Sequence, residues 1–151
     1  MVRVGPRDVK RTTVRVTPIA SNTLPLSALG TEFGKLMETV MTVPGVMAVV
    51  LSDDGGYAID YVFDEEQIDS LDVQIVGAQM VLPVQRLMKT ANKRGLGGAA
   101  VILESHQRHL MCAEVAGEYV LAAMLARQSN VALAFRRFEA ARARLQKLLV
   151  G

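Results

Sequence analysis

The side chains best suited to metal chemistry lie close together in the last third of the chain. His106 and His109 flank the tip of a predicted hairpin, and Cys112 follows three residues later. A zinc site needs three or four such ligands around one point, and further ligands would have to lie nearby. Because Cys112 falls inside an apolar segment, we interpret it as a buried structural thiol and expect no metal site.

Two glycine-rich stretches resemble phosphate-binding loops only superficially. Residues 30–35 (GTEFGK) are one residue short of the P-loop, have Leu36 in place of the Ser or Thr, and lie inside a predicted helix. Residues 95–98 (GLGG) lie between a helix and a strand, the reverse of the order in a dinucleotide-binding loop. The sequence also shows no Ser-His-Asp or Cys-His arrangement. We therefore predict a protein that is not an enzyme and binds no cofactor.

Charge is unevenly distributed along the chain, although the net charge is only +2. Eight acidic residues and no basic residue lie between Asp53 and Asp72, without the spacing of a calcium loop. Residues 1–25 instead carry five basic residues and one acidic residue. We interpret the acidic stretch as a solvated edge, and the polarised surface can orient a charged partner without identifying it.

The 151 residues fit one domain with a tail, and half of them are hydrophobic. No stretch approaches the roughly 18 apolar residues of a membrane span, so we expect no membrane insertion. The first residues include basic ones but no continuous apolar stretch, so we expect no secretory signal, and a single cysteine suits a reducing cytoplasm. Residues 1–24 are predicted to be a basic, partly disordered arm, dispensable for folding, and residues 25–151 a folded domain. The alternative for part of the arm is a short strand, formed around Val14, Val16 and Ile19, that is added to the sheet.

Hydrophobic patterning predicts the element order α-β-β-α-β-β-β-α. The first helix begins near Pro25, the central one covers 68–94, and the last is capped by Ser129 or Asn130. The strands are expected at 46–52, 57–63, 99–104, 108–114 and 119–125. Such strands form a five-stranded antiparallel sheet, with the first and last helices on one face and the central helix on the other. The last helix has a predicted core face of Val131, Ala134, Phe135, Phe138, Ala141, Leu145 and Leu148, opposite Arg136, Arg137, Arg144 and Lys147.

The central helix has more apolar surface than one core contact needs. Its predicted core face contains Val73, Val76, Met80, Val84, Leu87 and Ala91. A second stripe contains Leu71, Ile75, Ala78 and Leu82, mixed with Gln79, Gln85, Arg86 and Lys89. Because this helix is alone on its sheet face, we expect the second stripe to remain unburied within one chain. Pro83 removes a backbone donor and is expected to kink the helix.

Three features together resemble the Roadblock (dynein light chain) domain over residues 26–149. They are the strand-turn-strand VMAVVLSDDGGYAIDYVF, the long helix that ends in Gly-Leu-Gly-Gly, and the last helix that begins at Asn130 and carries arginines. Bacterial members of this family include regulators of Ras-like polarity GTPases. Pro83 and Ala132 depart from the usual pattern, and Pro83 leaves the shape of the partner face open.

The resemblance implies a dimer formed through the central helix and the following strand, with one continuous sheet and a platform for a small GTPase. The implied dimer residues are Leu71, Ile75, Ala78, Leu82, Ala99, Ala100, Val101, Ile102 and Leu103. Gln79, Gln85, Arg86 and Lys89 border this stripe and are the predicted partner-binding residues.

The leading hypothesis is therefore a cytoplasmic, homodimeric, non-catalytic scaffold or regulator of a small Ras-like GTPase, active in cell polarity or motility. One alternative is an adaptor that links motor or filament machinery to cargo without a GTPase, and another is a small-molecule-sensing domain. Nucleic-acid binding by the arm and the last helix is not expected, because the chain has only four Phe and three Tyr and a net charge of +2.

Overall fold

The computed structural model describes the backbone of residues 11–15 and 24–150 and the side chains of residues 32–150. Its helices are α1 (Leu24–Met41), α2 (Ser70–Lys93) and α3 (Val131–Val150). Its strands are β1 (Arg11–Arg15), β2 (Val46–Ser52), β3 (Ala58–Asp64), β4 (Ala100–Glu104), β5 (Arg108–Val115) and β6 (Tyr119–Ala126). All eight predicted elements are present, in the predicted order.

The strands form one antiparallel sheet in the order β1-β3-β2-β6-β5-β4. The last five are the five predicted strands. The sixth, β1, comes from the arm and pairs with β3, so that Arg11 lies opposite Asp64 and Arg15 opposite Asp60. A short added strand is therefore present, as in the alternative interpretation, but it covers residues 11–15 and includes Val14 alone of the three residues named for it. Val16 and Ile19 lie outside the described residues.

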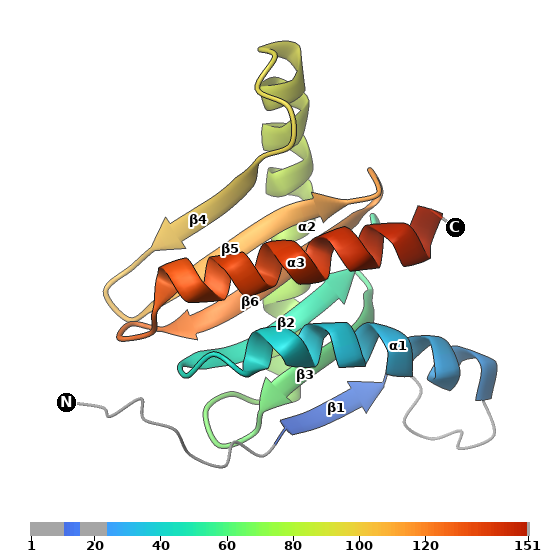
Figure 1. The fold of residues 1–151 in the computed structure, drawn as a ribbon, viewed down its shortest axis with the longest axis vertical. Helices are drawn as coiled ribbons and strands as arrows, with labels where there is room; N and C mark the ends of the chain where they lie inside the picture. Colours follow the sequence, from blue (N-terminus) through green and yellow to red (C-terminus); the bar gives the residue numbers. More distant parts are fainter. Residues whose placement is uncertain (1–10, 16–23, 151) are drawn as a thin grey trace.

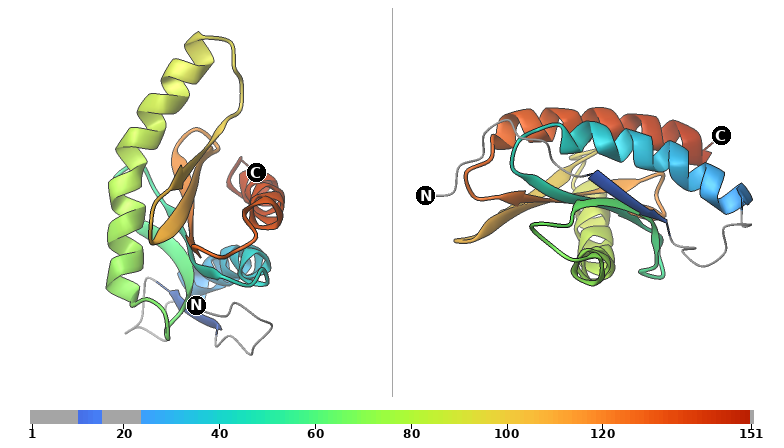
Figure 2. Two further views of the ribbon diagram at one scale, coloured as in Figure 1. Left: turned by 90° about the vertical axis from the view of Figure 1, so that its left-hand side faces the viewer. Right: turned by 90° about the horizontal axis from the view of Figure 1, so that it is seen from below.

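Helices cover both faces of the sheet, as the sequence predicts. Helices α1 and α3 lie side by side on one face, and α2 crosses the other (Figures 1 and 2). Each face has its own apolar core. Met37, Leu121 and Phe138 are buried between the sheet and helices α1 and α3, and Val50, Val73 and Val84 are buried between the sheet and α2. The predicted fold class is confirmed.

Helix α2 has well-defined ends. The Asp69 side chain accepts a hydrogen bond from the Asp72 amide (Oδ1···N 2.9 Å) and caps the first turn. At the other end, Gly95 has a φ of 73°, and the Leu96 amide donates to the Ala91 carbonyl (2.9 Å). The helix continues through Pro83, whose side chain is exposed, and the kink at this residue stays a prediction.

The buried face of α2 is rotated slightly from the prediction. It consists of Val73, Gly77, Val81, Val84, Met88 and Ala91. Leu87 was assigned to the core face, but it is 50% exposed, so this assignment is wrong. The reason is Gly77, which apolar patterning does not count as a core residue although it lies close against the sheet.

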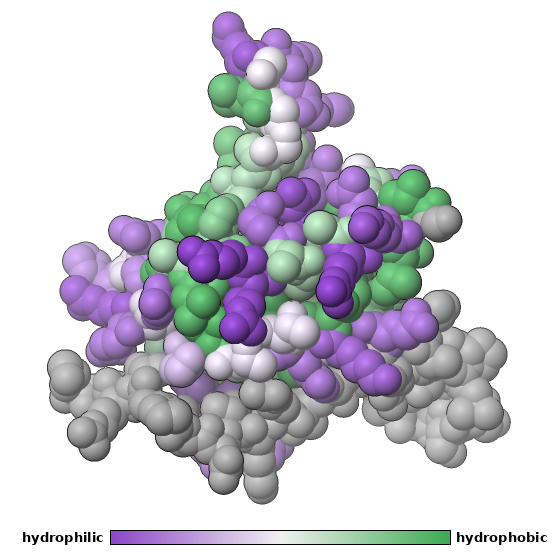
Figure 3. Space-filling view, in the orientation of Figure 1, coloured by the Kyte–Doolittle hydropathy of each residue, from purple (hydrophilic) through white to green (hydrophobic). Residues whose placement is uncertain are grey.

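Helix α3 follows the prediction except at its end. Asn130 caps it, since its Oδ1 accepts a hydrogen bond from the Leu133 amide (3.0 Å). Leu148 was expected in the core but is exposed, and Leu149 packs against the core instead. The outward face carries four basic residues, Arg136, Arg137, Arg144 and Lys147. Figure 3 shows hydrophilic side chains gathered over this helix, on the face of the molecule opposite α2.

Candidate interaction surface

The second apolar stripe of α2 is left exposed by the part of the chain that the structure describes, as predicted. Leu71, Ile75 and Leu82 are 63%, 43% and 55% exposed, and Ala78 between them is exposed as well. Their spacing along the helix places them in one line on its outer side. Contiguous exposed apolar surface of this kind makes the stripe a candidate interaction site.

Strand β4 is an unpaired sheet edge beside this helix. Among the described residues it pairs with β5 only. Its Ile102 and Leu103 are exposed, whereas Ala100, Val101 and the preceding Ala99 are half-buried. The C-terminal part of α2 extends beyond the sheet past this edge (Figures 1 and 2). An open edge with apolar side chains is a template for pairing with another strand.

The four predicted partner-binding residues lie on the outer side of α2. Gln79, Arg86 and Lys89 are exposed, and Gln85 is half-buried. Three of them line one hollow of about 510 Å³, together with Leu82, Asn92, Glu114 and Gly117. Gln79 does not line this hollow.

Glu114 was not predicted as a site residue. It comes from the end of β5 and reaches the same hollow as Arg86 and Lys89. Burial raises the pKa of its carboxyl above the usual value. Nothing in the local sequence indicates this neighbourhood, because it is created by the way α2 crosses the sheet.

No family model and no curated protein matches the chain by sequence. Solved structures with a similar fold do match it. A Roadblock/LC7 domain from Streptomyces avermitilis has a TM-score of 0.61 at 20% identity, covering 78% of this chain and 97% of that chain. This chain has the Roadblock fold.

Two bacterial structures with this Roadblock fold are similar to the chain over most of their length. MglB from Myxococcus xanthus has a TM-score of 0.63 at 17% identity, covering 82% of this chain and 89% of that chain. The gliding protein MglB from Thermus thermophilus has a TM-score of 0.69 at 11% identity, covering 80% of this chain and 90% of that chain. The predicted resemblance is therefore confirmed at the level of the fold.

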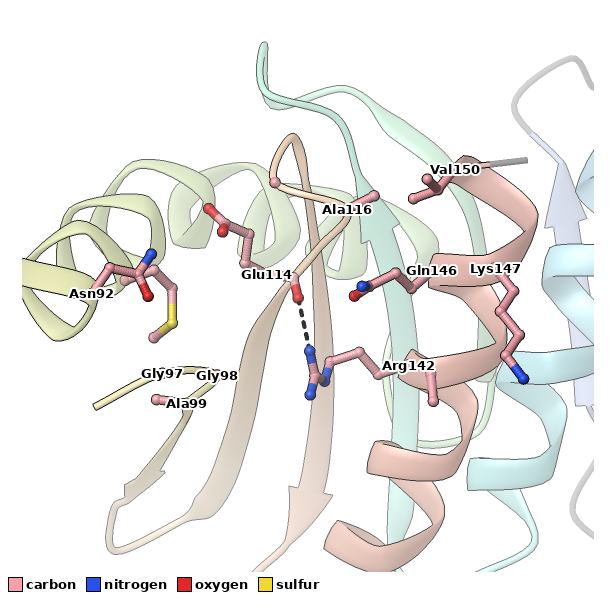
Figure 4. Close-up of a pocket in the computed structure, with 13 residues that line it drawn as sticks. Asn92, Gly97, Gly98, Ala99, Glu114, Ala116, Arg142, Gln146, Lys147 and Val150 are labelled. Atoms are coloured by element: carbon pink, nitrogen blue, oxygen red, sulfur yellow. Dashed lines mark hydrogen bonds between the residues drawn. The ribbon is translucent and has the colours of Figure 1, made fainter. Parts of the chain in front are cut away.

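A larger hollow of about 1040 Å³ in the Roadblock fold lies between the end of α2, the 97–99 segment and α3 (Figure 4). Arg142 lines this hollow, and its guanidinium already has hydrogen-bond partners within the chain. The guanidinium donates to both carboxylate oxygens of Glu139 (3.2 and 3.0 Å) and to the Glu114 carbonyl (3.3 Å). We therefore assign Arg142 a structural role, tying α3 to the end of β5.

The contacts of the two histidines and the burial of the cysteine also indicate structural roles. The His109 Nε2 lies 3.1 Å from the Arg127 carbonyl, and the Arg127 guanidinium donates to the His106 carbonyl (3.2 Å). These contacts tie the β4–β5 turn to the segment that precedes α3. Cys112 is fully buried, as predicted, and burial raises its pKa to about 12.

Metal-binding clusters and membrane-spanning helices are both absent from the described part of the chain. No three His, Cys, Asp or Glu side chains are grouped there so that they could hold a metal ion. No helix among the described residues is long and apolar enough to cross a membrane.

Proposed function

We propose that this protein is a homodimeric, non-catalytic scaffold that regulates a small Ras-like GTPase in the cytoplasm. The observation that carries the proposal is the exposed apolar stripe of α2 beside the unpaired edge of β4. The Roadblock fold supports it, since the family resemblance implies dimerisation through these elements and a GTPase platform on the paired helices.

Pairing of two β4 strands would extend the sheet across both copies. It would also bring the two protruding α2 helices together, so that Leu71, Ile75 and Leu82 become covered. Arg86 and Lys89 lie on the outer side of the same helix, and a two-fold axis would place both copies of them around one platform. A partner that docks there contacts two subunits at once.

The test is direct binding to the Ras-like GTPases encoded in the same genome. Each GTPase, loaded with GDP or with a GTP analogue, is titrated against the full-length protein. We expect one of them to bind in the micromolar range or tighter, with different affinities in the two nucleotide states. If none binds in either state, the GTPase proposal is wrong and the adaptor function becomes the better explanation of the same surface.

A further inference from the structure

Helix α3 presents a row of cations on the side that faces away from the sheet. At about 100° per residue, its outward positions lie along one strip of the helix surface. The basic residues of this strip are all exposed, and they are Arg136, Arg137, Arg144 and Lys147. Ala140 and Ala143 are exposed between them, so only small side chains separate the cations. Figure 3 shows the hydrophilic surface that results.

These cations are not neutralised within the described part of the chain. Arg137 donates a hydrogen bond to the Thr42 hydroxyl (Nη1···Oγ1 3.2 Å), which leaves its charge in place. Arg136, Arg144 and Lys147 have no hydrogen-bond or ion-pair partner among the described residues. Because Arg144 and Lys147 are three positions apart on one helix, they repel each other. The row therefore lowers the stability of α3 instead of raising it.

The charges next to the row do not cancel it. The one acidic residue of α3, Glu139, is already paired with Arg142 (3.0 Å). On the neighbouring helix α1, the charged residues are two acids and one base, namely Glu32, Glu38 and Lys35. At the ends of the neighbouring strands, two exposed acids are balanced by two exposed bases, which are Glu104, Glu118, Arg108 and Arg127. The surroundings thus contribute −1, and the face keeps a charge of +3 in each chain.

The remaining charges of the described chain lie elsewhere or cancel in pairs. In β1, two arginines lie opposite two buried aspartates, Arg11 opposite Asp64 and Arg15 opposite Asp60. The other exposed acidic residues lie in the β2–β3 turn and around the start of α2. Charge is consequently segregated between the two faces of the sheet, with the basic row on the α1 and α3 side.

The proposed dimer would place two such rows in one plane. A two-fold axis between antiparallel β4 strands runs perpendicular to the sheet, so both α3 helices would lie on one face of the continuous sheet and both α2 helices on the other. Helices α1 and α3 lie side by side as one layer (Figure 2). The dimer would therefore have a broad basic face opposite the paired α2 helices.

A broad face of this kind fits an anionic bilayer better than a nucleic acid or an acidic protein. A helix that reads DNA enters the major groove, whereas α3 has α1 beside it. Stacking of bases needs aromatic side chains, but Phe138 is buried and Phe135 is half-buried. A protein interface needs large anchors at its centre, where this face has Ala140 and Ala143. Anionic headgroups attract clustered Lys and Arg through charge alone.

We infer that the outward face of α3 is a binding surface for an anionic lipid bilayer, which it meets at the phosphate headgroups without crossing the hydrocarbon. Leu148 and Val150 are 44% and 71% exposed beside Lys147, and apolar side chains at the edge of a basic helix face suit the headgroup boundary. The doubling of this surface rests on the proposed homodimer, and the surface itself is independent of the GTPase. On a membrane, the α2 platform would point away from the lipid.

The experiment measures co-sedimentation of the full-length protein with vesicles of phosphatidylcholine, alone or in an equal mixture with phosphatidylglycerol. We expect binding to the anionic vesicles only, and added salt should weaken it. Each Lys or Arg at a bilayer surface raises partitioning by about fivefold, so Arg136→Glu with Arg144→Glu should lower binding by roughly 25-fold or more. Arg136→Lys with Arg144→Lys should retain binding, because the attraction depends on charge and not on the guanidinium fork.

The matched control is Lys93→Glu with Arg94→Glu. It makes the same change of net charge at two exposed residues at the end of α2, and it should bind anionic vesicles like the wild type. Unchanged binding of the α3 variant would overturn the inference, and so would equal losses in the two variants. A wild-type protein that binds duplex DNA and not the vesicles would assign the face to nucleic acid instead. No GTPase enters this assay, so its failure is distinguishable from failure of the proposed function.

Discussion

At the scale of single residues, Gly77 decides how closely α2 approaches the sheet. A Cβ atom at this position would lie 2.8 Å from the Ser52 Oγ and 3.0 Å from both Cγ atoms of Val50. Ser52 and Val50 are themselves buried in β2, so neither can move away freely. The missing side chain therefore sets the distance between helix and sheet, and with it the position of every residue on the exposed stripe.

Replacement of Gly77 by alanine should destabilise the protein. Overpacking a core typically costs about 1–3 kcal/mol, while alanine in a helix interior returns up to about 1 kcal/mol relative to glycine. We expect Gly77→Ala to lower the free energy of unfolding by about 1–2 kcal/mol, measured by chemical denaturation, since the clash outweighs the gain in helix propensity.

The control for this measurement is Gly98→Ala. A Cβ atom at Gly98 would meet nothing within 4 Å, so the substitution tests the effect of alanine without a clash, and we expect an unchanged midpoint. If Gly77→Ala were more stable than the wild type, helix propensity would outweigh packing and the close-approach explanation would be wrong.

Gly77 also helps to explain which details of the site could be predicted from the sequence. Periodicity correctly separated the exposed Leu71, Ile75 and Leu82 from the core, because exposure on a helix follows from its period alone. It misplaced Leu87, since a scale of side-chain hydrophobicity cannot recognise a glycine as a close contact. Glu114 could not be assigned to the surface from the sequence, because it reaches the hollow from the end of β5, which only the tertiary fold brings close to α2.

At the scale of elements, the helices and the strands β2 to β6 could be predicted from the sequence, whereas β1 could only be named as an alternative. The inner strands are buried on both faces, so a continuous apolar run identifies them. An edge strand such as β1 instead pairs on one side only, and its register depends on β3 rather than on its own pattern. The arm is thus the element whose contribution most needs measurement.

Deletion of residues 1–22 tests that contribution. It removes β1, whose only strand partner among the described residues is β3, while β3 keeps its pairing with β2. We expect the melting temperature to change little and faster hydrogen exchange in β3, whose outer edge becomes exposed. A loss of more than about 2 kcal/mol, beyond typical surface effects, would show that the arm is an integral part of the fold.

At the scale of the whole molecule, the described residues leave two features uncovered, the apolar stripe of α2 and the edge of β4. We expect a homodimer at micromolar concentration, with twice the chain mass of 16.4 kDa in light scattering. Ile102→Lys and Leu82→Glu place charges on the free edge and on the stripe, and both should shift the protein to monomer because burial of an unpaired charge is costly.

A matched substitution identifies the surface that holds the dimer together. Leu148→Lys also adds a charge at an exposed apolar residue, but on α3, across the sheet from α2. This variant should remain dimeric. A wild-type protein that stays monomeric throughout the micromolar range would remove the basis of the two-subunit platform.

The platform itself is tested by charge reversal at Arg86. Its guanidinium can form paired hydrogen bonds with a carboxylate of the partner, which the Lys89 ammonium cannot do. We expect Arg86→Glu to weaken GTPase binding by about 1–3 kcal/mol, the scale of a useful interface anchor, with the dimer intact. Arg86→Lys should fall between this variant and the wild type, because it keeps the charge and loses the paired geometry.

Arg144→Glu is the charge-matched control for Arg86→Glu. It makes the same change of charge at an exposed arginine of α3, so it reproduces any effect of net charge on association without touching α2. Equal losses in the two variants would indicate general electrostatic attraction. An unchanged affinity of Arg86→Glu would place the contact away from this helix, whereas a loss confined to Arg86→Glu would locate the GTPase on the paired α2 helices.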